Sequence, residues 1–340
     1  MDRARGTRAG LTGIGVYVPE GRITAGEIAS ASGLPRWVVT DKLGLTAKPK
    51  PGPEDHPTAM GVFAAREALS RAGVGAVEID VVISITEEYK DYPVWTAGIK
   101  LAHDLGATAA YAYDLGQKCG TGVLALKQAR DLIRADARVN TVLVAGGYRN
   151  GDLIDLTDPK LRFMFNLGAG GAAAVVQRGA GGHEVLDAAI ITDGSFSLDV
   201  LVPVGGTRAP LTAANVGDYR LRVGDPAGMK ERLEHKSLAT FLEVVRQAVA
   251  RSGYQVSDIG YLAMLHVKRS AHDYLLKELG LSEDQSIYLA DYGHLGQVDQ
   301  FLSLKLAEGQ GKLKPGDLVV LVAAGVGYVW NALCLKWGES

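Results

Sequence analysis

The chain has 340 residues, of which 47% are apolar and 22% are charged, and its formal net charge at pH 7 is -2. This much apolar material can build a sizeable core, and the length favours two domains or one large duplicated domain. The near-zero charge, with no Lys/Arg stripe interleaved with aromatic residues, argues against a nucleic-acid partner.

Two cysteines, Cys119 and Cys334, are too few for a disulfide framework and suit a reducing compartment. The opening residues, MDRARGTRAG, lack the apolar stretch of a signal peptide, so we expect a cytoplasmic protein. The uncharged run Leu318–Leu335 is nearly long enough to cross a bilayer, but Gly325 and Gly327 interrupt it. We therefore predict two buried strands joined by a glycine turn, and no membrane partner.

An internal repeat organises the chain. Residues 65–86 resemble residues 245–266 at a constant offset of 180, and each copy has an amphipathic helix, a glycine stop, an acidic turn and an apolar strand. Two further strands, 141–147 and 319–325, resemble each other at nearly the same offset. Strands that alternate with helices indicate βαβ units, and the sequence therefore predicts an α/β fold with two related halves. The predicted halves are residues 1–178 and residues 179–340.

The repeat brings four polar positions toward one place. Glu87 in the first copy and His266 in the second follow equivalent strands, and the segment around Cys119 corresponds to the segment around His294. Equivalent strand ends of two related halves meet near the axis that relates them. We therefore expect these four side chains to converge.

Cys119 stands between a polar turn and a long helical pattern, in DLGQKCGTGVLALKQA. A helix N-terminus favours a thiolate, and its free N–H groups can form an oxyanion hole. Glycines at 116, 120 and 122 leave room for a thioester to approach the sulfur. The alternative is a small buried structural cysteine, a role typical of Cys334 in its alternating strand.

A nucleophilic thiol needs a base or a hydrogen-bond donor, and two histidines stand where one is expected. His266 directly follows the apolar strand GYLAML, and His294 lies in the glycine-flanked turn DYGHLGQVD before a helix. No group of His, Cys or carboxylate residues has metal-ligand spacing, so we predict no metal site. The glycine-rich residues 166–176 lack a Walker lysine and predict a turn into a buried strand, not a nucleotide loop.

In this order, the segments resemble the thiolase superfamily, and within it the β-ketoacyl-ACP synthase III and 3-hydroxy-3-methylglutaryl-CoA synthase branch. The resemblance implies a duplicated thiolase-like fold, layered α-β-α-β-α with two pseudo-twofold-related halves, and a homodimer. It covers nearly the whole chain. The segments that carry it are LTGIGVYVPEGRIT, PGPEDHPTAMGVFAAREAL, DLGQKCGTGVLALKQA, FNLGAGGAAAVV, LHVKRSAHDYL, DYGHLGQVD and GDLVVLVAAGVGYVWNALCLKW.

The resemblance also implies roles for single residues. Cys119 matches the acylated nucleophile, and His266 matches the histidine that supports the thiolate and hydrogen-bonds the incoming carbonyl. An oxyanion hole is implied for the N–H of Cys119 together with the loop of Gly325, Val326 and Gly327. Contacts to CoA or to a carrier arm are implied for Trp37, Arg36 and Lys42.

Two positions depart from the ketosynthase pattern. His294 stands where ketosynthases of this branch carry Asn; an imidazole can donate one hydrogen bond as an amide does, but it can also be protonated or act as a base. Glu87 falls where the hydroxymethylglutaryl-CoA synthase group carries a catalytic glutamate. The alternative for Glu87 is a solvated loop carboxylate beside Glu88.

The resulting hypothesis is a cysteine-dependent acyltransferase that forms an acyl-S-enzyme from acyl-CoA or acyl-ACP and transfers the acyl group by Claisen-type C–C condensation. A covalent intermediate and an oxyanion hole supply this chemistry, so no metal or redox cofactor is expected. Two alternatives stay open. One is an aldol condensation of the hydroxymethylglutaryl-CoA synthase kind that uses Glu87, and the other is a non-condensing partner subunit of a synthase complex.

Overall fold

The computed structural model describes residues 7–179 and 181–338, and in this part of the chain it contains seven α-helices and thirteen strands. The elements up to residue 178 are β1 (Ala9–Tyr17), β2 (Gly21–Thr24), α1 (Ala25–Ser32), β3 (Ala47–Lys50), α2 (Pro57–Ala72), β4 (Val81–Ser84), α3 (Ala97–Leu105), β5 (Tyr111–Asp114), α4 (Thr121–Ala135), β6 (Thr141–Tyr148) and β7 (Gly170–Arg178). Those that follow are β8 (His183–Thr192), β9 (Val200–Leu201), β10 (Arg222–Val223), α5 (Pro226–Arg251), β11 (Ile259–Met264), α6 (Arg269–Leu279), α7 (Asp299–Gly309), β12 (Leu318–Gly325) and β13 (Val329–Lys336).

Nine strands form one sheet in the order β11-β12-β13-β8-β1-β7-β6-β4-β5. The arm β1-β7-β6-β4 has the same order and pairing directions as the arm β8-β13-β12-β11, and β4·β6 corresponds to the parallel pair β11·β12. Among the strands that the structure describes, the two arms pair with each other through a short β1·β8 contact of two residue pairs. This topology confirms the duplicated α/β fold that the repeat predicts. The domain boundary after residue 178 stays a prediction.

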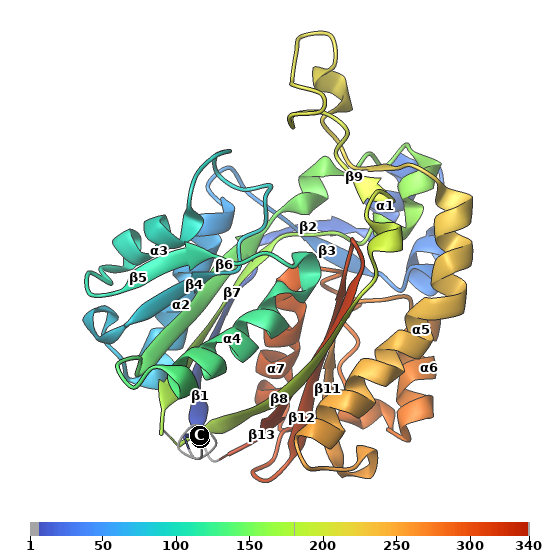
Figure 1. The fold of residues 1–340 in the computed structure, drawn as a ribbon. Helices are drawn as coiled ribbons and strands as arrows, with labels where there is room; N and C mark the ends of the chain where they lie inside the picture. Colours follow the sequence, from blue (N-terminus) through green and yellow to red (C-terminus); the bar gives the residue numbers. More distant parts are fainter. Residues whose placement is uncertain (1–6, 180, 339–340) are drawn as a thin grey trace.

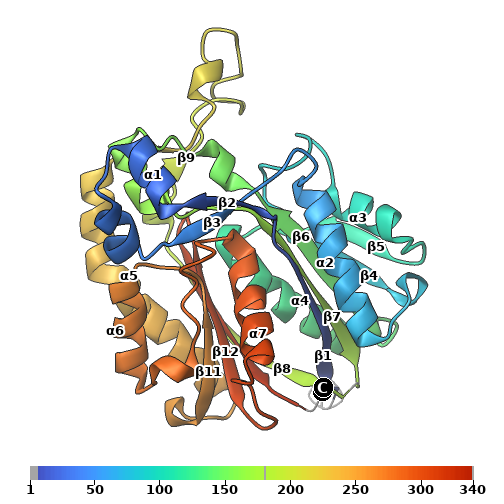
Figure 2. The same ribbon diagram turned by 180° about the vertical axis from the view of Figure 1, so that it is seen from behind.

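The helices form three layers around the two arms. Figures 1 and 2 show α2 and α3 outside the first arm, α5 and α6 outside the second arm, and α4 and α7 between the arms. Each layer has its own apolar contacts: α2 and α3 pack on β4, β6 and β7, and α5 and α6 pack on β11, β12 and β13. The central cluster joins α4 and α7 to the inner faces of both arms. The expected α-β-α-β-α layering is therefore confirmed.

The uncharged run near the end of the chain forms β12 and β13, which pair antiparallel, with Val320 opposite the buried Cys334. This confirms the prediction of two buried strands joined by a glycine turn. None of the helices in the described ranges combines the length and the apolar composition that a membrane crossing needs.

One end of the molecule carries most of the irregular structure. The antiparallel pair of β2 and β3, between which α1 lies in the chain, packs with α1 at this end, where α4 and α7 also begin (Figure 1 and Figure 2). The chain between β9 and β10 extends from the body there, as the yellow segment of Figure 1 shows. The polar positions singled out in the sequence lie among these connections.

Candidate active site

Cys119 lies in a tight turn directly before α4 and is buried, with 8% of its surface exposed. The residue before it, Lys118, has a φ of +53°, so the backbone bends sharply at the thiol. Asn331 of β13 holds this turn, because its side-chain amide donates to Gln117 Oε1 at 2.7 Å and to the Gly120 carbonyl at 2.9 Å. The thiol therefore sits at a helix N-terminus, where the partial positive charge favours a thiolate.

The starts of α4 and α7 meet beside the thiol. A Cβ atom on Gly122 would lie 2.6 Å from the Gln297 carbonyl oxygen and 2.8 Å from the ring of Phe301, so only glycine permits this approach. The Gln297 side chain donates to backbone carbonyls at the ends of β4 and β6, at 2.6 and 3.1 Å. The predicted meeting of the segments around Cys119 and His294 is thereby found in the structure.

His294 is the imidazole neighbour of the thiol. Its backbone is fixed by hydrogen bonds of 2.9 Å to the Asn166 carbonyl and from the Gly168 N–H. The ring nitrogen Nδ1 donates to Asp299 Oδ2 at 2.6 Å. His294 and Cys119 influence each other's pKa through charge and a side-chain hydrogen bond, and Nε2 is the ring nitrogen that the bond to Asp299 leaves free.

Burial and charge act in opposite directions on this pair. Burial raises the pKa of the Cys119 thiol, and the charge of Glu87 adds to the rise, whereas His294 lowers it. Burial lowers the pKa of His294, but the adjacent Asp299 carboxylate and the Cys119 sulfur outweigh burial, so this pKa lies well above its ordinary value. The pKa of the Cys119 thiol stays above its ordinary value overall, and the imidazolium form of His294 is the group in this pair that favours the thiolate.

His266 lies at the end of β11, beside the same carboxylate, because its backbone N–H donates to Asp299 Oδ2 at 2.8 Å. Both of its ring nitrogens are occupied: the Asn166 side-chain amide donates to Nδ1 at 2.8 Å, and Nε2 donates to the Gly44 carbonyl at 3.1 Å. Burial lowers the pKa of His266, and the Gly44 hydrogen bond opposes it. His266 is thus held as a neutral imidazole, and its predicted support of the thiolate stays a prediction.

Glu87 and Glu88 have different surroundings. Glu88 is exposed and forms an ion pair with Lys118, as expected of a loop carboxylate. Glu87 is buried and accepts a hydrogen bond of 2.7 Å from the Asn150 amide, while its Oε1 has no partner among the residues that the structure describes. Burial, opposed by the charge of Lys118, raises the pKa of Glu87 to about 6. Glu87 also interacts electrostatically with His294, and it therefore belongs to the same cluster.

The glycine loop after β12 begins against the nucleophile turn. A Cβ atom on Gly325 would lie 2.8 Å from the Gln117 carbonyl oxygen and 3.1 Å from the Cys119 backbone nitrogen. The close approach therefore requires glycine and brings the backbone of Val326 and Gly327 to the region of the thiol.

The three residues expected to contact CoA or a carrier arm are exposed, and 55% of the Trp37 surface is accessible. Arg36 and Lys42 flank the turn Val38–Lys42 that follows this tryptophan. The same segment continues to Gly44, whose carbonyl accepts the hydrogen bond from His266. A short stretch of chain thus links the exposed tryptophan to the buried site.

Four polar residues that hold the cluster together were not predicted from the sequence. Asp299 is the first residue of α7 and the last residue of DYGHLGQVD, and an acidic residue in a first helical turn is too common in helices to single it out. The three asparagines occur singly, and neither their spacing nor their residue type assigned them a role, although two of them lie in segments that carry the family resemblance. They are Asn150, Asn166 and Asn331.

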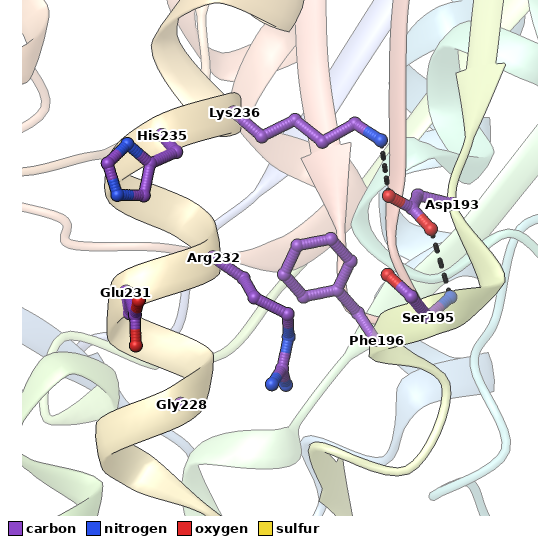
Figure 3. A pocket seen from close by; sticks show the side chains of 8 residues that line it. All are labelled: Asp193, Ser195, Phe196, Gly228, Glu231, Arg232, His235 and Lys236. Carbon is purple, nitrogen blue, oxygen red and sulfur yellow. Dashed lines mark hydrogen bonds and ion pairs between the residues drawn. The ribbon is translucent and has the colours of Figure 1, made fainter.

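The surface has pockets on the second half of the chain and beside the β2·β3 pair. Figure 3 shows one of about 390 Å³ between α5 and the turn after β8. Its cationic groups Arg232 and Lys236 are paired with Asp199 and Asp193, and it contains none of the predicted site residues. The second, of about 300 Å³, includes Gly168, whose N–H donates to the His294 carbonyl. Within residues 7–179 and 181–338, no three His, Cys, Asp or Glu side chains are grouped to hold a metal ion.

Two family models match the chain, and together they match just over half of it. The model of 3-oxoacyl-[acyl-carrier-protein] synthase III matches residues 113–194, and the model of the C-terminal part of this synthase matches residues 249–337. The first contains Cys119, and the second contains His266 and His294.

Similar proteins span the whole chain. The β-ketoacyl-[acyl-carrier-protein] synthase III of Symbiobacterium thermophilum is 29% identical over 334 residues, which cover 97% of this chain and 98% of that protein. The protein of the same name from Agrobacterium fabrum is 28% identical over 337 residues, with 97% and 99% covered. The crystal structure of 3-oxoacyl-(acyl carrier protein) synthase III from Pseudomonas aeruginosa superposes with a TM-score of 0.84 at 22% identity, over 98% of this chain and 99% of that chain. This last likeness shows a shared fold.

Proposed function

Because the chain belongs to the 3-oxoacyl-[acyl-carrier-protein] synthase III family of the thiolase superfamily, we propose that it forms an acyl-S-enzyme on Cys119 and passes the acyl group to a second substrate. The donor is an acyl-CoA or an acyl carrier protein, and the transfer is a Claisen-type C–C condensation. The observation that carries the proposal is a buried thiol at the start of α4, beside an imidazole whose pKa lies above its ordinary value.

The proposed first step is an acyl transfer from sulfur to sulfur. The Cys119 thiolate attacks the thioester carbonyl, a C–S bond forms, and the carbonyl oxygen becomes negative. The N–H of Cys119 and those of the loop Gly325, Val326 and Gly327 are the proposed oxyanion hole. Collapse of the intermediate breaks the C–S bond to the donor, whose sulfur takes up a proton and leaves as a thiol. This chemistry needs no metal and no redox cofactor.

The family and the exposed segment Arg36–Lys42 support a site for the donor's pantetheine arm. Trp37 offers an exposed ring for stacking on an adenine or for packing against the arm, and Arg36 and Lys42 offer positive charge to phosphate groups. We also assign a homodimer, since β5 lies at the sheet edge and Tyr111 on it is half exposed. A cytoplasmic location completes the proposal, in keeping with two unpaired cysteines.

A Glu87→Gln variant tests whether this carboxyl group takes part in the reaction as an acid or base, as the aldol alternative requires. The pKa of Glu87 is raised to about 6, so the side chain is protonated below this pH and ionised above it. We expect the wild-type transfer rate to rise with pH through about 6. The variant should show no such rise, and at pH 7.5 it should be about 10²-fold slower than the wild type. The measurement is kcat/KM against pH, and Glu88→Gln is the matched control because Glu88 is exposed. An unchanged pH profile in Glu87→Gln would remove this residue from the mechanism.

The proposal as a whole is tested by acylation. Purified protein is mixed with a panel of acyl-CoAs and acyl carrier proteins, and intact-mass spectra are followed by peptide mapping. We expect a mass increase of one acyl group on the peptide that contains Cys119 and none on the peptide of Cys334. If every donor leaves the mass unchanged, the acyltransferase proposal fails and the non-condensing partner-subunit alternative takes its place.

A further inference from the structure

Asp299 is fully buried at the first position of α7, and both oxygens of its carboxylate accept hydrogen bonds. Its Oδ2 accepts from His294 Nδ1 at 2.6 Å and from the His266 backbone N–H at 2.8 Å. Its Oδ1 accepts from the Leu295 backbone N–H at 2.6 Å. Three N–H donors stabilise the ionised carboxylate, so this buried charge is compensated.

The carboxylate determines which ring nitrogen of His294 carries a hydrogen. An ionised carboxylate is only an acceptor, so Nδ1 must be the N–H of the neutral ring. Nε2 then presents its lone pair to the Cys119 sulfur, and becomes an N–H donor only when it has taken up a proton. An asparagine at this position would present a permanent donor to its neighbour and would accept no proton on its amide nitrogen. Toward Cys119, therefore, the neutral imidazole of His294 accepts a hydrogen bond, whereas the amide nitrogen of an asparagine would donate one.

We infer that Asp299 is a positioning residue that completes a Cys119–His294–Asp299 triad, in which His294 is the base for the thiol. The inference rests on the proposed function for its substrate, but the proton transfer itself requires no substrate. Asp299 orients the imidazole of His294 and stabilises the imidazolium once it forms, as the carboxylate does in other triads of nucleophile, base and carboxylate.

The proton balance of the first half-reaction follows from this arrangement. The thiol proton of Cys119 moves to His294 Nε2, which gives a thiolate and an imidazolium. The thiolate forms the new C–S bond, the C–S bond of the donor breaks, and the imidazolium returns the same proton to the departing thiolate. One thioester and one thiol are consumed, and one thioester and one thiol are produced.

Several other groups face His294 and enter its titration. Three of them interact electrostatically with His294: Cys119 in the turn before α4, Glu87 in the connection after β4, and His266 at the end of β11. Tyr148 of β6 has its ring centroid 6.1 Å from the imidazole. Glu87 favours the imidazolium by its charge, His266 disfavours it when protonated, and Tyr148 is neutral because burial raises its pKa well above the ordinary value. Among these neighbours, the α7 carboxylate makes the direct hydrogen bond to Nδ1.

Asp299→Asn tests the assignment with little change in shape. The new amide is neutral and has one acceptor oxygen for three N–H donors. Its NH₂ group must face either the Leu295 N–H or the His266 N–H together with Nδ1, and in both orientations the imidazolium of His294 loses its negative partner. We measure the second-order rate constant for alkylation of Cys119 by iodoacetamide against pH, in a Cys334→Ala background. We expect a fall of about 10²-fold at pH 7 and a pH profile shifted to higher pH, because the neutral amide no longer stabilises the imidazolium that forms together with the thiolate.

A double-mutant cycle with His294→Asn separates positioning from a purely structural role. If Asp299 acts through His294, then Asp299→Asn has little further effect on alkylation once His294 is Asn. An equal effect in both backgrounds, or an unchanged pH profile in Asp299→Asn, overturns the inference. Thermal unfolding of each variant identifies loss of fold.

A second measurement needs no substitution at Asp299. In protein labelled with ¹⁵N-histidine, with His294 assigned by comparison with His294→Asn, the ¹⁵N shifts of neutral His294 should report a hydrogen on Nδ1. A hydrogen on Nε2 would overturn the inference. Alkylation and NMR involve no acyl donor, so a failed acylation panel with these results intact would reject the proposed function alone.

Discussion

A Cys119→Ala variant is expected to form no acyl adduct and to transfer acyl groups at least about 10⁴-fold more slowly than the wild type. The reason is that the covalent intermediate needs the sulfur, whereas the oxyanion-hole N–H groups of the backbone remain and supply only residual catalysis. Single-turnover rates with the donor found in the acylation panel provide the measurement. The unfolding free energy should fall by about 1 kcal/mol, because alanine leaves a small cavity where the buried sulfur stood.

Cys334→Ala is the matched control, because this second thiol is also buried and unpaired but lies in the sheet at β13. We expect it to keep full acyl transfer and to lose about 1 kcal/mol of unfolding free energy, since a small cavity replaces the sulfur. Adduct formation that survives in Cys119→Ala and disappears in Cys334→Ala would reverse the assignment of the nucleophile.

The fold could be predicted because its signals are periodic and repeated. Residues 65–86 and 245–266 became α2 with β4 and the last turns of α5 with β11, in the same place of each arm. Alternating apolar strands and amphipathic helices carry this information in a few consecutive residues, and duplication supplies it twice. The repeat also predicted that the turns before α4 and α7 meet, which the contact of Gly122 with Gln297 confirms.

The side-chain geometry of the site could not be predicted in the same way. The orientation of His266 depends on Gly44 and Asn166, which are distant from it in the sequence and whose residue types do not indicate a contact with a histidine. Whether Glu87 or Glu88 is buried depends on the path of the irregular connection after β4. No helical or strand periodicity in the sequence predicts which side chain of such a connection points inward. The role of Asp299 depends on which nitrogen of His294 it meets, and this is a property of the folded turn. Residue types and spacing therefore identified the participants but not their hydrogen bonds.

His294→Asn is expected to slow the loading of Cys119 by about 10²- to 10³-fold at pH 7. The thiol would lose the imidazole that lowers its pKa, while burial and Glu87 would still raise it, so less thiolate would be present. The variant carries the amide that ketosynthases of this branch have at this position, so it distinguishes a base from a permanent hydrogen-bond donor. Stopped-flow measurement of the released CoA thiol gives the loading rate. If His294 serves only as a donor to a carbonyl oxygen, the variant will load as fast as the wild type.

The control for this variant is His183→Asn. His183 is also buried, but it stacks on Trp337 with ring centroids 3.4 Å apart, and burial lowers its pKa to about 4. We expect His183→Asn to lower the unfolding free energy by about 1–3 kcal/mol and to leave loading unchanged. His294→Asn should cost a similar amount, because Asp299 keeps the His266 and Leu295 N–H donors but loses the imidazole. Two variants with equal losses of stability and a large difference in loading would show that the imidazole of His294 acts on the sulfur itself.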